Sequence, residues 1–397
     1  MSTTRYIRAF ALGFSCCGAL LLPVVMHAQL KAEVDPPRWR GALALTIGGA
    51  SVTDEASTFG DVVGITVDAG GRVFIADGQD QQIRVFSSTG VFVSKIGRKG
   101  AGPVEFNGLG NIAFAPDGLL WVRDERNGRF QVLDVRSTPV KFVRTVPLLN
   151  HSTGSRQPIT FDVAGNVIDE WSFFDAKAKR FRPSRIRLSS AGVSLQTDTL
   201  PIPIGADVGE YKIITAQKSA TGTVIGTSEQ RIFQPYGPQW VRAYGAMGAR
   251  ADAVSSRYDV SVYDDRGTLV RHLVRKIPVV PLSSAERAIG EERLKSVTNI
   301  AGASAGSIPF GVPRVHPPLV GLAYATDGTL WVERTTADGQ PREADLYDTS
   351  GRRIATAEWP REFEATRGRT LFVGNRQTCS LALDNDQVQR VVCLRFK

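Results

Sequence analysis

Charged residues in two short segments are the part of this 397-residue sequence best suited to chemistry. The first segment is the pair Arg98 and Lys99, and the second is the run RDER at 123–126. Guanidinium groups donate paired hydrogen bonds to carboxylates and phosphates, and an ammonium group adds a point charge. These segments predict a binding site for an anionic group, formed by Arg98, Lys99, Arg123, Glu125 and Arg126.

A second basic cluster lies in the run KAKRFRPSRIR at 177–187. Phe181 stands among its cations, which are Lys177, Lys179, Arg180, Arg182, Arg185 and Arg187. Such a cluster could dock on an acidic polymer or on lipid head groups, but a charged run of this kind is more typical of a solvated hairpin turn. Stacking motifs are missing from the sequence, so a nucleic-acid partner is not expected.

Residues suited to catalysis or metal binding do not form a recognisable motif. Beyond the first 28 residues the histidines are isolated from one another, at His151, His272 and His316. A zinc-dependent lyase would need several histidines that converge on one site. Calcium would need hard oxygen ligands, and spacing does not single out the candidates Glu105, Asn107, Asn111 and Asn166. We therefore predict no catalytic residue, no metal ligand and no cofactor, with calcium as the alternative.

A repeated sequence pattern predicts the strands and turns that position these residues. Apolar strands alternate with glycine turns in GITVDAGGRVFIADGQDQQIRVF at 64–86, and the pattern returns at 111–134 and 321–332. Asp77 and Asp124 end equivalent strands 47 residues apart, and we expect their carboxylates to accept bonds from loop N–H groups. Two hairpins in a unit of roughly 40–50 residues are typical of a propeller blade.

The repeat predicts an all-β fold: a six-bladed β-propeller of four-stranded antiparallel blades, with one short helical insertion near 282–298. The fourth blade is long and poorly patterned, so it could conceal an extra blade. A strand at 42–47 is expected to close the ring by pairing with the last blade. The blades are expected at about 59–97, 105–147, 156–200, 205–273, 317–358 and 361–397.

The insertion after the fourth blade breaks the strand pattern. Ser283 and Glu286 form a capping box at the start of PLSSAERAIGEERLKSV, which predicts a helix. A loop of small residues and prolines follows up to position 318. The segment could serve as a lid or docking arm, or it could be disordered or merely packed against the propeller.

The N-terminus has the layout of a secretory signal peptide. Arg5 and Arg8 precede an apolar stretch from Phe10 to Met26, and cleavage is expected between Ala28 and Gln29. The alternative is an uncleaved membrane anchor, but the stretch is shorter than the roughly 20 residues of a spanning helix. We expect a leader at 1–28, a propeller domain at 29–397, and a periplasmic or extracellular protein with no stable membrane span. Removing the two leader arginines changes the net charge from +9 to +7.

Two cysteines remain after the leader, Cys379 and Cys393. A hairpin centred on Asp386 would place Leu381 opposite Val391 and the two cysteines opposite each other, close enough to bridge. An exported chain with an even number of cysteines favours a disulfide. The alternative is a pair of buried thiols.

The first two blades resemble the NHL repeat family. The first copy carries Gly64, Ile65, Val67, Asp68, Phe74, Ile75, Ala76, Asp77, Ile83, Arg84, Val85 and Phe86. The second copy carries Ile112, Trp121, Val122, Asp124, Asn127, Arg129, Phe130, Gln131 and Val132. The resemblance implies a six-bladed propeller of the exported bacterial type. We expect the turn carboxylates of Asp68, Asp117 and Asp327 to be structural, because such groups bond nearby backbone.

Because no catalytic constellation is visible, we expect a non-enzymatic binding or scaffolding module for a protein, peptide or glycan partner. The alternative is a metal-dependent propeller enzyme of lactonase or lyase type, with its site at the central channel. A cell-surface sensor that forms part of a larger assembly is a third possibility. No feature of the sequence indicates an oligomeric state, and fold does not imply function.

Overall fold

The computed structural model describes residues 35–50, 54–148, 158–175, 180–201, 208–245, 248–300, 308–363 and 371–397. Within these residues, Pro36–Lys397 belong to a single unit. The expected leader and its cleavage point lie outside the described residues. A search of the described residues finds no helix that is both long and apolar enough to cross a membrane.

The first blade follows directly from its sequence pattern. Its strands pair in chain order as an antiparallel sheet, β2 (Val62–Val67), β3 (Val73–Asp77), β4 (Gln82–Phe86) and β5 (Phe92–Ile96). The Val- and Ile-rich strands β2 to β4 are buried, whereas the outer strand β5 is mostly exposed. The turn between β2 and β3 is held by Asp68, whose Oδ1 accepts from the Arg72 N–H at 2.8 Å.

Carboxylates hold the equivalent turns of other blades in the same way. Asp117 accepts from the Leu119 N–H and Asp327 from the Thr329 N–H, both at 2.9 Å. A glycine with positive φ follows each, at Gly118 and Gly328. The structural role expected for these turn carboxylates is confirmed.

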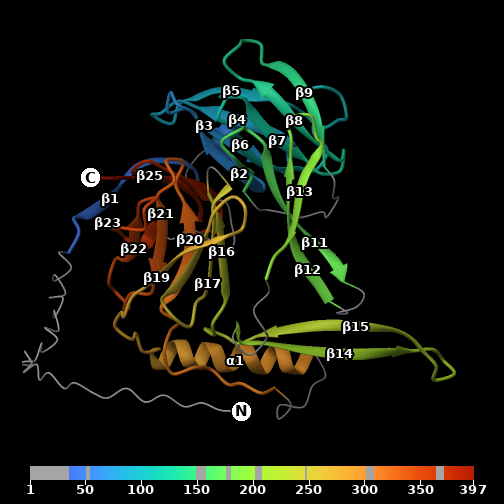
Figure 1. Ribbon diagram of the computed structural model, residues 1–397, viewed down its shortest axis with the longest axis vertical. Helices are drawn as coiled ribbons and strands as arrows, with labels where there is room; N and C mark the ends of the chain where they lie inside the picture. Colours follow the sequence, from blue (N-terminus) through green and yellow to red (C-terminus); the bar gives the residue numbers. More distant parts are fainter. Residues whose placement is uncertain are drawn as a thin grey trace, which may run out of the picture. The chain divides into compact units, whose positions relative to one another are not determined.

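Three further sheets repeat the arrangement along the chain (Figure 1). The second blade comprises β6 (Leu109–Phe114), β7 (Leu120–Asp124), β8 (Arg129–Asp134) and β9 (Lys141–Pro147). The third comprises β10 (Thr160–Phe161), β11 (Val167–Asp175), β12 (Arg180–Leu188) and β13 (Ser194–Thr199). The fourth comprises β16 (Trp240–Tyr244), β17 (Arg250–Val254), β18 (Asp259–Tyr263) and β19 (Leu269–Val274).

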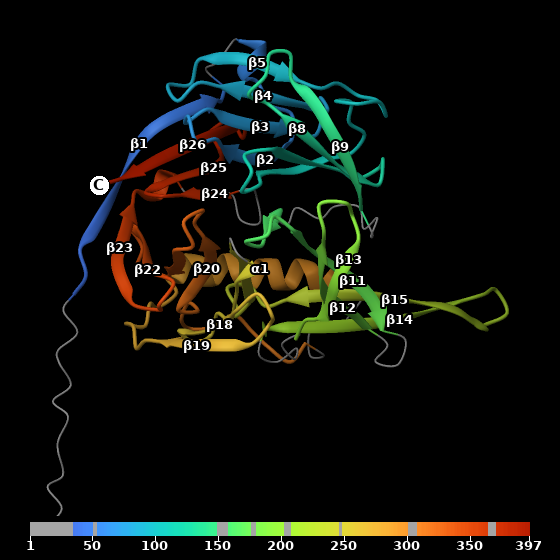
Figure 2. The ribbon, with the colours of Figure 1, turned by 45° about the horizontal axis from the view of Figure 1, so that its top comes forward.

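The last two blades share one eight-stranded sheet (Figure 2). The fifth comprises β20 (Leu319–Tyr324), β21 (Leu330–Arg334), β22 (Arg342–Tyr347) and β23 (Arg353–Trp359). The sixth comprises β24 (Leu371–Gly374), β25 (Gln377–Leu383), β26 (Gln389–Phe396) and the N-terminal strand β1 (Arg38–Gly48). Strand β1 pairs antiparallel with β26 and parallel with β23, so the start of the chain completes the blade at its end.

The described residues therefore form a β-propeller of six four-stranded antiparallel blades. The segment at 205–273 was expected to form one blade, but the structure divides it into a hairpin and a blade. Its first part is a separate two-stranded hairpin, β14 (Glu210–Lys218) and β15 (Val224–Phe233), and only β16 to β19 form the blade. The sequence did not separate them, because the turn at Gly222 has the same Ser/Thr-Gly chemistry as a blade hairpin.

One α-helix, α1 (Ser284–Ile300), lies in the described residues, close to the expected 282–298, together with short 3-10 turns at Glu55–Ser57 and Arg361–Phe363. The capping box at the start of α1 is formed as expected. The Glu286 N–H donates to Ser283 Oγ at 3.2 Å, and the Ser283 N–H donates back to Glu286 Oε2 at 2.9 Å.

Apolar side chains join neighbouring blades. Phe74 and Ile83 of the first blade pack in one cluster with Ile112 and Leu120 of the second. A second cluster joins the first blade to the sixth and includes the two cysteines. Because burial of each large side chain stabilises the fold by about 1.5–3 kcal/mol, these clusters fix the loops at the blade ends relative to one another.

The two cysteines form a disulfide, Cys379–Cys393. The register is the expected one, with Leu381 opposite Val391 and Cys379 opposite Cys393 on β25 and β26. Both cysteines are fully buried.

We expect the double variant Cys379→Ala/Cys393→Ala to lose about 3 kcal/mol of unfolding free energy, because the bridge restricts the unfolded chain. Urea denaturation of the wild type and the variant measures this loss. Added reductant should destabilise the wild type and leave the variant unchanged. Equal stability of the two proteins under oxidising conditions would contradict the expectation.

Candidate functional site

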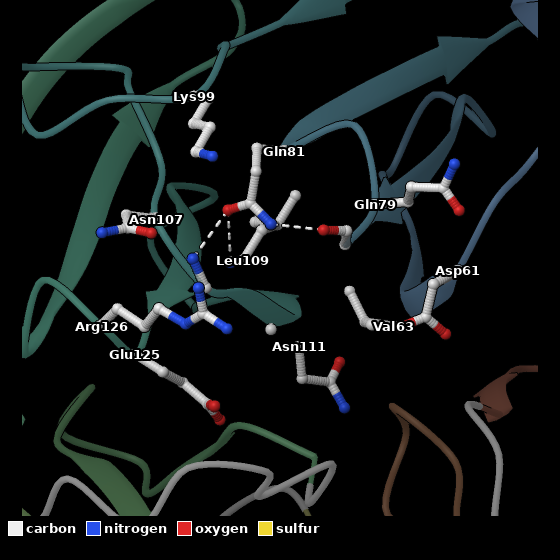
Figure 3. A pocket seen from close by; sticks show the side chains of 13 residues that line it. Asp61, Val63, Gln79, Gln81, Lys99, Asn107, Leu109, Asn111, Glu125 and Arg126 are labelled. Atoms are coloured by element: carbon white, nitrogen blue, oxygen red, sulfur yellow. Dashed lines mark hydrogen bonds between the residues drawn. The ribbon is translucent and has the colours of Figure 1, made fainter.

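A cavity of about 590 Å³ lies at one end of the first two blades (Figure 3). The first blade contributes residues before β2 and from the turn between β3 and β4, including Asp61, Gln79 and Gln81. The second blade contributes the connector before β6 and the turn between β7 and β8, including Lys99 and Arg126. In an antiparallel blade these two kinds of loop lie at the same end, so the topology brings them together.

Gln81 joins the two blades across the cavity wall. Its Oε1 accepts hydrogen bonds from the N–H groups of Gly108 and Leu109, at 2.7 and 2.9 Å. Its Nε2 donates to the carbonyl oxygen of Gly78 in its own turn. Figure 3 shows the side chain between the two sets of lining residues. Gln81 is therefore a positioning residue for this cavity.

We expect Gln81→Ala to lower the unfolding free energy by about 1–3 kcal/mol, because two backbone N–H groups lose their acceptor. Hydrogen exchange of the Gly108 and Leu109 amides should accelerate in the variant. Gln79→Ala is the matched control, because Gln79 is an exposed neighbour in the same turn. Unchanged protection of both amides in Gln81→Ala would show that the hydrogen bonds to Gln81 do not stabilise the connector.

A glycine in the connector lets the opposite wall form. Gly108 has a φ of +84°, and a Cβ there would lie 2.9 Å from Arg126 Cγ. The Arg126 N–H donates to the carbonyl oxygen of Asn107 and the Glu125 N–H to that of Gly108, both at 2.9 Å. The turn carrying Glu125 and Arg126 is therefore fixed against the connector through its backbone.

Buried carboxylates support both walls from below. Asp77 accepts hydrogen bonds from the N–H groups of Gly60, Asp61 and Gln79, at 2.9–3.1 Å. Asp124 accepts from the Asn107 N–H at 2.7 Å. Both carboxylates are fully buried at the ends of equivalent strands, which confirms the structural role expected for them.

The structure separates the five residues of the expected anion site. Lys99, Glu125 and Arg126 line the cavity. Arg98 instead pairs with Glu105 at 2.7 Å on the surface, with its side chain 78% exposed. Arg123 is buried inside β7, where its Nη1 donates to Asp169 Oδ2 of the third blade at 3.1 Å.

Cavity residues outside that expected set were missed as site residues. They are Asp61, Val63, Gly78, Gln79, Gln81, Asn107, Gly108, Leu109, Gly110 and Asn111. Asn107 and Asn111 had been considered only as calcium candidates. Asn107 lies in the connector just before β6 and Asn111 lies within β6, so their place at the start of one blade is the only local signal that links them.

The basic cluster at 177–187 forms contacts between blades where it is described. Arg185 pairs with Asp198 at 2.9 Å and donates to the carbonyl oxygen of Gly248, and Arg187 donates to that of Asp265. Arg185 and Arg187 therefore lie in β12 and contact other residues, whereas the turn itself lies outside the described residues. Lys177 and Lys179 lie outside the described residues, and so do the side chains of Arg180 and Phe181.

The histidines that the structure describes are each paired with one carboxylate. His272 Nδ1 lies 3.2 Å from Asp259 and His316 Nε2 lies 3.1 Å from Glu286, whereas His151 lies outside the described residues. Among the described residues, no three His, Cys, Asp or Glu side chains gather as a metal site would require.

The calcium candidates do not form one group of ligands. Glu105 binds Arg98 and the Gly102 N–H, and Asn166 donates to Asp162 in the third blade. Asn107 and Asn111 line the cavity.

A polar network joins the third and fourth blades. Tyr244 donates to Glu170 Oε2 at 2.5 Å, and Arg242 lies 3.5 Å from Glu170 Oε1 and 2.5 Å from Asp252 Oδ1. Burial raises the pKa of Glu170 above its ordinary value, although Arg242 and the bond from Tyr244 oppose the shift.

A carboxyl group with a raised folded-state pKa binds more protons in the folded protein than in the unfolded chain. Its contribution to stability is therefore lost as pH rises from the ordinary glutamate pKa through the raised value. We expect Glu170→Gln to gain stability relative to the wild type over that interval. Urea denaturation of both proteins at successive pH values measures the difference, and a difference independent of pH would contradict the assignment.

Part of the chain matches a known family model. Residues 52–133, about a fifth of the sequence, match the DUF5128 family, described as a 6-bladed beta-propeller. This agrees with the number of blades that the NHL resemblance implied, whereas membership of the NHL family itself stays a prediction. A search of curated proteins finds no match.

Solved structures match most of the chain at low sequence identity. Virginiamycin B lyase from Staphylococcus aureus is 12% identical, with a TM-score of 0.39, and the match covers 88% of this chain and 98% of the lyase. The calcium-binding protein regucalcin from Agrobacterium tumefaciens is 12% identical, with a TM-score of 0.40, covering 90% and 94%. A PQQ-bound aldose sugar dehydrogenase from Streptomyces coelicolor is 13% identical, with a TM-score of 0.44, covering 91% and 100%. At these identities, the activities of these proteins say nothing about this chain.

Proposed function

We propose that the chain is an exported, NHL-like propeller that acts as a non-enzymatic binding or scaffolding module for a protein, peptide or glycan partner. The partner would be held at the cavity between the first two blades. The expected leader and the disulfide support export, because disulfides persist mainly in oxidising compartments.

The observation that carries this proposal is the chemistry of the cavity lining. Its thirteen residues include the amides of Gln79, Asn107 and Asn111, together with two carboxylates and two cations. Amide side chains both donate and accept hydrogen bonds, so they suit the backbone of a peptide or the hydroxyl groups of a glycan. None of the thirteen is a serine, cysteine or histidine, so they do not include the nucleophile and base of a serine or cysteine hydrolase.

A cavity-filling variant tests the proposal. Asn107→Trp would place an indole in the cavity, and no side-chain bond of Asn107 is lost among the described residues. Ser88→Trp is the matched control, because Ser88 is exposed in the turn at the other end of the first blade. Each protein is applied to one array of peptides and one array of oligosaccharides.

We expect wild type and Ser88→Trp to bind a common set of probes and Asn107→Trp to lose that set. Binding that survives Asn107→Trp would place the site elsewhere. Mass spectrometry of the eluted probes tests the lyase form of the enzyme alternative, because a lyase that acts on a bound probe would return it cleaved.

A further inference from the structure

The cavity contains charges of both signs, but they are not equally compensated. Asp61 and Glu125 each interact with another group of the protein. Within the described residues, the side chains of Lys99 and Arg126 have neither a salt bridge nor a hydrogen bond, and both residues are exposed. Two cationic side chains are therefore available to contact a ligand in the cavity.

The turn that carries Arg126 is fixed through its backbone. Its backbone N–H is bonded to Asn107, and the absence of a Cβ at Gly108 allows the turn to lie against the connector. Figure 3 shows the Arg126 and Lys99 side chains reaching into the cavity from the second blade, with Asp61 on the opposite side. The backbone that carries the Arg126 side chain therefore does not have to rearrange when a ligand binds.

The neighbouring carboxylates limit the charge of the anion. Asp61 and Glu125 line the same cavity, so a doubly charged phosphate would be repelled more strongly than a singly charged carboxylate. A guanidinium also matches a carboxylate in shape, because it donates two parallel hydrogen bonds.

The remaining lining favours a peptide over a sugar. Its amides match peptide backbone groups, whereas none of the thirteen lining residues offers an aromatic face on which a sugar ring could pack. We infer that the cavity binds a carboxylate of an acidic peptide through Arg126 and Lys99. This inference rests on the binding function proposed above and adds the class of ligand to it.

Matched peptides test the inference. The probes are glycine-serine hexapeptides with a central Glu or Gln, each with a free or an amidated C-terminus, so that side-chain and terminal carboxylates are distinguished. Binding is measured by fluorescence anisotropy to wild type, Arg126→Ala, Lys99→Ala and Arg98→Ala. Arg98→Ala is the control, because it removes a nearby exposed cation that is already paired with Glu105.

We expect a probe with a carboxylate to bind wild type more tightly than its uncharged counterpart. Arg126→Ala should weaken that binding by about 10- to 100-fold, since hydrogen bonds to charged groups contribute about 1.5–3 kcal/mol. Lys99→Ala should weaken it less, and Arg98→Ala should leave it unchanged.

Equal binding of charged and uncharged peptides would overturn the inference and leave the proposed binding function standing. An equal loss in Arg98→Ala and Arg126→Ala would also overturn it, because a diffuse surface charge would then explain the attraction. Binding of uronic-acid oligosaccharides in place of acidic peptides would overturn the choice of ligand class. The absence of any probe binding to the cavity would count against the proposed function itself.

Discussion

Replacing Asp124 by alanine is expected to lower the unfolding free energy by about 3–5 kcal/mol, because it leaves buried polar partners without their acceptor. The fully buried carboxylate accepts from the Asn107 N–H at 2.7 Å and from the Arg129 Nε at 2.8 Å. It also accepts from Asn127 and Gln131, at 2.9 and 3.2 Å. These bonds tie the connector, the turn and β8 together beneath the cavity.

Urea denaturation with tryptophan fluorescence measures the loss. Asp117→Ala is the matched control, because this exposed turn carboxylate accepts a local hydrogen bond from the Leu119 N–H. Asp124→Asn should recover part of the stability, since an amide oxygen can still accept from Asn107. A loss in Asp124→Ala no greater than that in Asp117→Ala would contradict the structural role.

Arg123→Ala is expected to destabilise the protein by about 3–5 kcal/mol, because it leaves the carboxylate of Asp169 unpaired between two blades. Arg123 is 3% exposed, its guanidinium lies 5.0 Å from the ring centre of Phe130, and it pairs with Asp169 at 2.5 Å. Arg126→Ala, three residues away, should leave stability unchanged, because Arg126 is exposed.

A double-mutant cycle distinguishes the energy of the Arg123–Asp169 pair from a general loss of packing. If the pair is responsible, Arg123→Ala/Asp169→Ala should be less destabilised than the sum of the single variants. Arg98→Ala provides a second control, with its exposed pair to Glu105 contributing nothing measurable. Additive single effects, or an Arg126→Ala variant as unstable as Arg123→Ala, would refute this division of roles.

The two arginines show where sequence interpretation reaches its limit. Arg123 was expected to bind an anion, but it lies in β7, and its side chain pairs with Asp169 of the next blade. Arg126, three residues later, lies in the turn between β7 and β8 and lines the cavity. Strand ends are uncertain by a few residues from sequence, and one such residue decides between a ligand contact and a structural ion pair.

Local features of the fold were predictable and non-local ones were not. The cysteine register and the capping box at Ser283 depend on neighbouring residues, and both were anticipated. The bridge from Gln81 to Gly108 joins loops 27 residues apart in the chain, so no local pattern indicates it. The hairpin β14–β15 was merged with a blade because its turn chemistry is the same.

The most direct test of the account is a calorimetric titration of the protein with the Glu-containing hexapeptide, followed by mass analysis of the peptide. We predict saturable binding to wild type, its loss in Asn107→Trp and an unchanged peptide mass. Undiminished binding to Asn107→Trp, or a peptide recovered in altered form, would contradict the claim that this propeller holds its ligand in the cavity without chemistry.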